Sequence, residues 1–365
     1  MTQSTKRPEP RPGILDIKPY VGGKAKAAGA NRAIRLASNE NPLGASPAAI
    51  EAYKAAADSL NRYPDGGCND LRAAIGKAEG LDPERLVCGA GSDELIQLLV
   101  RGYAGSGDEV LYSQHGFLVY PLASMAVGAK PVTAPEKNLR ADVDALLAGV
   151  TQRTRIVFLA NPNNPTGSYL DRDSVARLQA GLPDDVLLAL DSAYAEYVEA
   201  EDYEAGVDLV SKSQNTVMLR TFSKIHGLAA LRLGWAYGPA SVIDVINRIR
   251  GPFNVTAAAQ AAGVAAIEDR DHVARSIALN SKVLASFSEA VRALGLEVAP
   301  SVGNFVLVRF PNPEKSAKDA ESWLAGEGVL ARGMAAYGLP DCLRITIGLE
   351  DDMVAVADSL RDFLK

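Results

Sequence analysis

Short apolar segments alternate with amphipathic segments along the first two-thirds of the chain. Segments with helical periodicity, such as 93–103 and 171–180, separate the apolar ones. Several apolar segments are almost continuously hydrophobic, which is typical of strands buried on both faces of a parallel sheet. This alternation predicts an α/β fold with a mostly parallel sheet between helices. The predicted strands are 85–88, 109–112, 130–133, 155–160, 186–190, 216–220 and 233–237.

The pattern changes after about residue 250. A long helical region is expected over 257–294, followed by a strand-rich stretch over 297–310, a helix over 317–327 and a last strand over 342–347. This order predicts a second, smaller α+β domain. We therefore expect an N-terminal arm with part of the small domain (1–45), a large domain (46–255) and a small C-terminal domain (256–365).

Composition narrows the possible partners. The chain has 365 residues, 47% of them hydrophobic, which is enough for a large buried core. The formal net charge is −6 and no block of basic residues stands out, so nucleic acid and anionic membrane are poor candidates. The apolar runs are too short to span a bilayer. The first residues are not followed by the apolar segment that is typical of a secretory signal, so no such signal is expected. Three widely spaced cysteines fit a reduced, cytoplasmic protein.

Several common catalytic patterns are missing from the sequence. There is no GxSxG and no GxxxxGK[ST], which disfavours α/β-hydrolases and P-loop nucleotide hydrolases. The dinucleotide pattern GxGxxG fails because Glu94 occupies its last glycine position, so a nicotinamide-dependent oxidoreductase is also disfavoured. The three histidines do not have the spacing of a metal site, and none is predicted.

Polar residues follow the ends of several predicted strands, where open parallel sheets bind ligands. Lys224 could form a Schiff base with an aldehyde, or be a solvated surface lysine. Asp191 could pair with a pyridine nitrogen, or cap the next helix, and Tyr194 follows three residues later. Asn161 opens the turn NPNNPTG and could donate a hydrogen bond to a ring oxygen, or belong to a simple turn.

A second group of residues suits a phosphate. Gly91, Ser92 and Asp93 precede a predicted helix, whose N-terminus favours an anion. Arg232, eight residues after Lys224, could bind the same anion in fork geometry. An amine, a phosphate site, a carboxylate for a pyridinium and donors for a ring oxygen together describe pyridoxal 5′-phosphate (PLP).

The chain resembles the histidinol-phosphate aminotransferases, a family of fold-type I PLP enzymes. The resemblance extends from about residue 14 to the end. The motifs that carry it are PYVGGK (19–24), LASNENPLG (36–44), RYPD (62–65), NPNNPTG (161–167), DSAY (191–194), TFSK (221–224) with Arg232, and CLRITIG (342–348).

The resemblance implies a role for each matching residue. Lys224 would form the Schiff base and move the proton, and Asp191 would pair with the pyridinium nitrogen. Asn161 and Tyr194 would hold the ring oxygen, and Phe117 would stack on the ring. Tyr63 would reach the cofactor phosphate of the partner in a homodimer. The implied phosphate residues are Gly91, Ser92, Asp93, Thr221, Ser223 and Arg232, and the implied substrate residues are Tyr20, Asn39, Arg332 and Arg344.

The expected activity is transfer of an amino group between glutamate and imidazole-acetol phosphate, forming histidinol phosphate in histidine biosynthesis. Three alternatives stay open. The chain could be an aromatic amino acid aminotransferase of the same family, a PLP-dependent decarboxylase of a phosphorylated amino acid, or a non-catalytic binding protein on the same scaffold.

Overall fold

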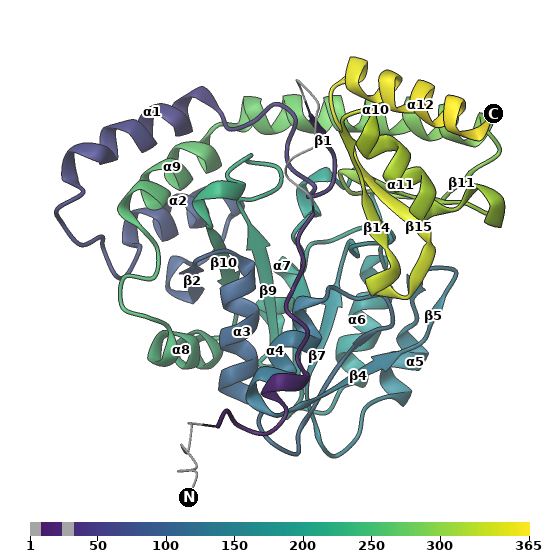
Figure 1. Ribbon diagram of the computed structural model, residues 1–365. Coiled ribbons are helices and arrows are strands. Elements are labelled where there is room, and N and C mark those ends of the chain that lie inside the picture. Colours follow the sequence, from purple (N-terminus) through teal and green to yellow (C-terminus); the bar gives the residue numbers. More distant parts are fainter. Residues whose placement is uncertain (1–8, 24–32) are drawn as a thin grey trace, which may run out of the picture.

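The computed structural model describes residues 9–23 and 33–365 (Figure 1). The start of the expected arm and Lys24 of the PYVGGK motif lie outside these residues. A seven-stranded sheet has the strand order β2-β10-β9-β8-β7-β3-β4, and only β10 is antiparallel to its neighbours. The α/β fold class and all seven predicted strands are confirmed. Their bounds are β2 (Leu86–Gly89), β3 (Glu109–Ser113), β4 (Lys130–Ala134), β7 (Thr154–Ala160), β8 (Leu187–Asp191), β9 (Thr216–Thr221) and β10 (Gly234–Tyr237).

Helices cover both faces of this sheet, which explains the continuous hydrophobicity of its strands. Successive strand residues point to opposite faces, so Phe158 and Leu159 of β7 enter different hydrophobic clusters. The face that contains Phe158 packs on α3 (Ser92–Tyr103), α4 (Val119–Val127) and α8 (Ala240–Ile249). The second packs on α2 (Asn69–Glu79), α5 (Val143–Ala148), α6 (Arg172–Gly181), α7 (Val207–Lys212) and α9 (Ala257–Glu268), with α1 (Pro47–Ala55) lying against α9.

A second sheet forms in the C-terminal part of the chain. Its strand order is β11-β12-β15-β14, with β11 (Glu297–Val298), β12 (Phe305–Arg309), β14 (Arg332–Met334) and β15 (Leu339–Thr346). Its core includes residues of α10 (Arg270–Ala293), α11 (Ala317–Gly326) and α12 (Glu350–Leu364). A short parallel pair, β1 (Ile34–Arg35) with β13 (Val329–Leu330), brings the N-terminal segment beside this part. The domain boundaries at residues 45 and 255 stay a prediction.

The predicted elements differ from the structure in detail. The helical region 257–294 is divided into α9 and α10 at Asp269, whose side chain accepts a hydrogen bond from the His272 N–H and so caps α10. The last strand begins at Leu339 rather than at residue 342. A small hairpin of β5 (Glu136–Lys137) and β6 (Arg140–Ala141) follows β4 and had no counterpart in the predicted elements.

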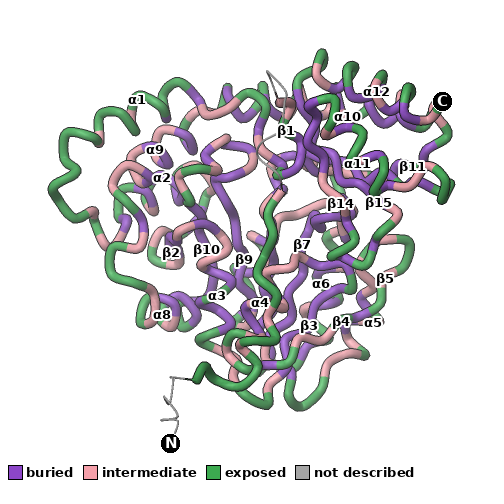
Figure 2. The backbone as a smooth tube through the Cα atoms, in the orientation of Figure 1, coloured by how far each residue is buried: buried purple, intermediate pink, exposed green. Residues whose placement is uncertain are grey.

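The buried residues of the protein are concentrated in and around the two sheets. In Figure 2 the strands are mostly buried, whereas α1 and α12 have exposed outer faces. Within residues 9–23 and 33–365, none of the helices has the length and apolar character that crossing a membrane requires.

Candidate active site

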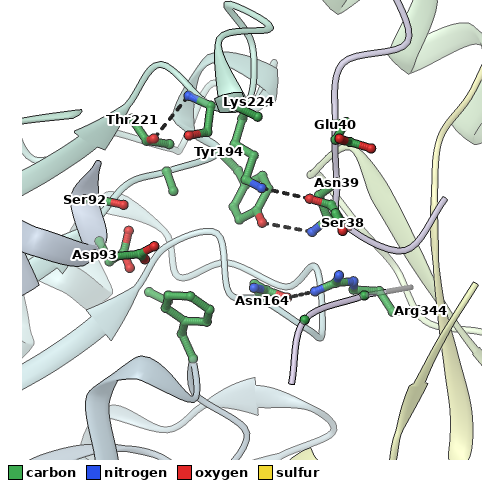
Figure 3. A pocket seen from close by; sticks show the side chains of 18 of the residues that line it. Ser38, Asn39, Glu40, Ser92, Asp93, Asn164, Tyr194, Thr221, Lys224 and Arg344 are labelled. Atoms are coloured by element: carbon green, nitrogen blue, oxygen red, sulfur yellow. Dashed lines mark hydrogen bonds between the residues drawn. The ribbon is translucent and has the colours of Figure 1, made fainter. Parts of the chain in front are cut away.

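A cavity of about 270 Å³ lies between the two parts of the molecule. On one side are the carboxyl ends of β7, β8 and β9 and the N-terminus of α3; on the other are Ser38–Glu40 and the strands β14 and β15 (Figure 3). Most of the residues predicted for the site line this cavity. They are Tyr20, Asn39, Ser92, Asp93, Phe117, Asp191, Tyr194, Thr221, Ser223, Lys224, Arg232, Arg332 and Arg344.

Lys224 lies in the turn after β9 and reaches across the cavity (Figure 3). Its Nζ donates a hydrogen bond to the carbonyl oxygen of Ser38 at 3.1 Å. Burial lowers the pKa of Lys224 to about 8, and the positive charge of Arg344 adds to the effect. Because the amine loses its proton more readily than an ordinary lysine, it is suited to act as a nucleophile and as a base.

Asp191 ends β8 at the floor of the cavity. Its Oδ2 accepts a hydrogen bond from the Tyr120 hydroxyl at 2.8 Å, while its buried Oδ1 has no partner among the residues that the structure describes. Burial raises the pKa of Asp191 to about 6, although the Tyr120 hydrogen bond opposes that rise. A buried carboxylate with one free oxygen favours a cationic N–H donor as its partner.

Tyr120 contacts the predicted site residue Asp191, and the sequence analysis did not include it among the site residues. It is fully buried on α4, and its ring stacks on Phe158 with centroids 4.5 Å apart. A buried tyrosine needs a hydrogen-bond partner for its hydroxyl. The hydrophobic periodicity of the sequence does not identify which residue is that partner. Phe117, which lines the cavity as predicted, packs edge-on against the same tyrosine at 5.9 Å.

The N-terminus of α3 lies at one end of the cavity. Gly91 precedes the helix, and no side chain among residues 9–23 and 33–365 caps its first turn, so the N–H groups of that turn can bind an anion. Arg232 donates to the Ser223 hydroxyl at 3.2 Å and pairs with Asp93 at 3.1 Å. Thr221 lies beside them and accepts a hydrogen bond from the Ser223 N–H.

Gly91 itself does not line the cavity, but its position requires glycine. Its φ is +84°, and a Cβ there would lie 2.7 Å from Nη2 of Arg232. Glycine therefore allows the arginine to lie directly against the start of α3.

The structure corrects the expectation for Asn161. Its Oδ1 accepts from the Leu170 N–H at 2.7 Å, and its Nδ2 donates to the Leu170 carbonyl at 3.0 Å. The amide closes the turn after β7 and does not line the cavity. Asn164 of the same NPNNPTG turn lines the cavity instead (Figure 3). The repeated Asn-Pro step was visible in the sequence, but the turn geometry decides which amide faces inward.

Two arginines differ in how firmly they are held. Arg344 is 2% exposed; it donates to Asn164 Oδ1 at 2.5 Å and to the Ala37 carbonyl at 2.7 Å. Its buried Nε has no partner in the described part of the chain. Arg332 lies at the cavity rim, where it donates to the Tyr20 hydroxyl and to the Val21 carbonyl, both at 3.0 Å. Both guanidinium groups can bind an anionic substrate.

Tyr63 is not part of this cavity within one copy of the chain. Its side chain is 83% exposed and stacks on Phe253 with centroids 4.7 Å apart. Its predicted role across a dimer interface stays a prediction.

Comparison with known proteins identifies the class. The family described as aminotransferase class I and II matches residues 31–359. The histidinol-phosphate aminotransferase of Rhodospirillum centenum is 60% identical over 98% of this chain and 99% of its own, and that of Rhodopseudomonas palustris is 55% identical over the same shares. The crystal structure of the Sinorhizobium meliloti histidinol-phosphate aminotransferase in complex with pyridoxal-5′-phosphate superposes with a TM-score of 0.90 at 27% identity, covering 99% of this chain and 98% of that one.

The chain therefore belongs to the class I and II aminotransferase family. The curated relatives named above match it over nearly their full length, and both are named histidinol-phosphate aminotransferases.

Proposed function

We propose that this protein is a PLP-dependent aminotransferase that transfers an amino group between glutamate and imidazole-acetol phosphate, forming histidinol phosphate. One observation carries the proposal: a lysine of lowered pKa, a buried carboxylate with a free oxygen, and an uncapped helix N-terminus beside an arginine surround a single cavity. The names of the full-length relatives support the choice of substrate.

The residues fit PLP at each of its polar ends. A protonated ring nitrogen would give Asp191 Oδ1 the partner that it lacks among the described residues. The phosphate would lie at the start of α3 with Ser92, Ser223 and Arg232. Tyr194 and Asn164 would donate to the ring oxygen, because Asn164 already uses Oδ1 to accept from Arg344 and keeps Nδ2 as its donor.

When bound, PLP supplies an aldehyde for the substrate amine and a ring that accepts the electron pair left when the Cα–H bond breaks. Lys224, as its neutral amine, would be the base that accepts the proton from the substrate Cα and holds it for return. Asp191 would hold the ring nitrogen through Oδ1, and a cationic N–H at that place would favour the carboxylate over the neutral acid that burial favours. Phe117 covers the cavity from the α4 side and limits the access of water.

The facing arginines fit two kinds of substrate. A glutamate carboxylate and a phosphate monoester are both anions that a guanidinium binds through two parallel hydrogen bonds. The buried Nε of Arg344, which has no partner among the described residues, would be available for such a contact, and Arg332 offers a second positive charge at the rim. One cavity can therefore accept both substrates in turn.

A single half-reaction tests this proposal. The protein is purified with PLP, and the absorption change is recorded after addition of histidinol phosphate or, separately, of phenylalanine. We expect rapid conversion of the cofactor to its amine form with histidinol phosphate and a much slower change with phenylalanine. Faster conversion by phenylalanine would instead indicate the aromatic aminotransferase. Release of carbon dioxide from a phosphorylated amino acid would indicate a decarboxylase.

We also propose a homodimer in the cytoplasm. Tyr63 and Leu60 are highly exposed, and Ile50 and Tyr53 on α1 are a little under half exposed, which suits a surface covered by a second copy. Free, buried cysteines suit a reducing compartment. Sedimentation should give twice the mass of the chain, and Tyr63→Ala should weaken cofactor retention. A fully active monomer would contradict the dimer, and recovery of the protein from an oxidising compartment would contradict the location.

A further inference from the structure

The Tyr194 hydroxyl is held by a chain of hydrogen bonds that begins outside the cavity, on β15. Asn39 Nδ2 donates to the Tyr194 hydroxyl oxygen at 2.9 Å (Figure 3). The Thr346 hydroxyl donates to Asn39 Oδ1 at 3.1 Å and accepts from the Asn39 backbone N–H at 2.9 Å. Asn39 and Thr346 are 1% and 2% exposed, so water does not replace these partners.

The directions of these hydrogen bonds follow from the groups involved. A backbone N–H can only donate, so the Thr346 oxygen is the acceptor in its bond with Asn39. The single hydroxyl proton of Thr346 then goes to Asn39 Oδ1. This sets the orientation of the amide, with Nδ2 toward Tyr194. Because the Tyr194 oxygen accepts from Nδ2, its own proton is left to point toward the cavity.

The opposite orientation of the amide is disfavoured. With Oδ1 toward Tyr194, the tyrosine proton would be donated to Asn39 and withdrawn from the cavity. The buried Thr346 hydroxyl would then lose the acceptor for its proton, and an unsatisfied buried donor is unfavourable. The threonine hydroxyl therefore determines which way the tyrosine donates.

The backbone of Asn39 shows that the segment is held in one conformation. Its φ is +56°, in the left-handed region that asparagine tolerates better than most residues. The Asn304 side chain donates to the Asn39 carbonyl at 3.1 Å, and the Thr346 N–H donates to the Leu36 carbonyl at 2.9 Å. These contacts hold the backbone of Asn39 and Leu36, and so fix the place from which the Asn39 side chain extends.

We propose that Thr346 is a positioning residue that, through Asn39, makes Tyr194 a hydrogen-bond donor to the ring oxygen of the bound cofactor. This inference rests on the proposed function. A donor to that oxygen favours its ionised form, so loss of the donor makes the bound cofactor hold its proton to higher pH. Thr346 acts through Asn39 and Tyr194 and does not itself line the cavity.

The test is a pH titration of the visible absorption band of the bound cofactor, with no substrate present. Tyr194→Phe, which removes the donor outright, should raise the midpoint by about one pH unit or more. Thr346→Val should raise it by at least half as much, and Thr346→Ala provides a second variant without the hydroxyl in case Val does not fold. Thr346→Ser keeps the hydroxyl and should restore the wild-type midpoint.

A double variant and a matched control separate positioning from general destabilisation. If Thr346 acts through the tyrosine, the double variant with Thr346→Val and Tyr194→Phe should titrate like Tyr194→Phe alone. Thr216→Val is the matched control, because it also removes a buried hydroxyl from a strand. The Thr216 hydroxyl oxygen is 2.9 Å from the Ser213 hydroxyl oxygen and does not line the cavity. This variant should be less stable than the wild type but should titrate with the same midpoint.

Each result has one meaning. A wild-type midpoint in folded Thr346→Val, or a double variant in which the two shifts add, would overturn the proposal. A wild-type protein that forms no visible band with PLP would contradict the proposed function itself.

Discussion

The cavity has two walls that are built in different ways. The sheet wall is the side formed by the large sheet. It consists of Ser92, which begins α3, Asp191, which ends β8, and Lys224, which follows β9. We call Asn39 and Arg344, with the segment and strand that carry them, the facing wall. The sheet wall rests on hydrophobic clusters that are continuous across the strands.

The facing wall depends on hydrogen bonds between chain segments that are far apart in sequence. Arg344 and Thr346 of β15 contact Ala37 and Asn39, in each case across 307 residues. Each wall also reaches the other, because Lys224 donates to Ser38 and Asn164 accepts from Arg344. The difference suggests that the sheet wall holds the cofactor while the facing wall orients groups and recognises the substrate.

The largest effect is expected from the sheet wall. Lys224→Ala removes both the amine nucleophile and the base, so transamination should fall by about 10⁴-fold or more. PLP should still bind without a covalent link, through the α3 end of the cavity. Single-turnover absorbance with histidinol phosphate measures the loss. Lys212→Ala, at an exposed lysine on α7, serves as the control and should behave like the wild type.

The facing wall should affect substrate recognition more than cofactor binding. Arg344→Gln leaves Asn164 and Ala37 without a charged donor and removes a buried cation, so kcat/KM for both anionic substrates should fall by roughly 10²–10³-fold. PLP affinity, measured by equilibrium dialysis, should change much less. A larger loss in PLP affinity than in kcat/KM would show that the two walls do not divide their tasks in this way.

The pH dependence tests the electrostatic contact between the walls. Only the neutral amine of Lys224 attacks an aldehyde, so the rate at which the apo-protein captures PLP covalently should rise about tenfold per pH unit and level off near pH 8. The break lies below that of an ordinary lysine because burial and the charge of Arg344 both disfavour the ammonium form. In Arg344→Gln the break should move to higher pH. Stopped-flow absorbance measures both, and an unchanged break would remove Arg344 as a cause.

Asn161 and Asn164, two of the three asparagines of the turn, should differ in their effects on activity and stability. Asn164→Ala should reduce kcat/KM by about tenfold, because it removes one donor into the cavity and the acceptor that holds Arg344. Asn161→Ala should instead lower the free energy of unfolding by about 1–3 kcal/mol, because it leaves the buried N–H and carbonyl of Leu170 without their partners. Thermal unfolding and steady-state kinetics are measured on both variants, and the reverse assignment of effects would restore Asn161 to the site.

The smallest effect is expected at the rim. Arg332 makes its hydrogen bonds with Tyr20 and Val21 at a partly exposed position, and exposed contacts of charged groups contribute little. Arg332→Gln should therefore raise KM by a few-fold and leave kcat unchanged. An effect as large as that of Arg344→Gln would show that the rim arginine closes onto the substrate.

Much of the sheet wall could be predicted from the sequence. Continuous apolar strands identify a doubly covered sheet, and a polar residue at the end of such a strand must face its edge, as Asp191 does and as Lys224 does just beyond β9. The residues of the facing wall, Asn39 and Arg344, were predicted only from the family resemblance. No local pattern indicates that residues 307 positions apart share a hydrogen bond.

The sequence by itself determined the fold class, the order of the strands along the chain and the chemistry available at their ends, because periodicity and burial are local properties. Only the tertiary structure decided that Asn164 rather than Asn161 faces the cavity, that Tyr120 holds Asp191, and that the Thr346 hydroxyl orients Asn39. These outcomes depend on the direction of single side chains in a turn, a helix and a distant strand. Such directions follow from contacts that form when the two parts of the chain come together.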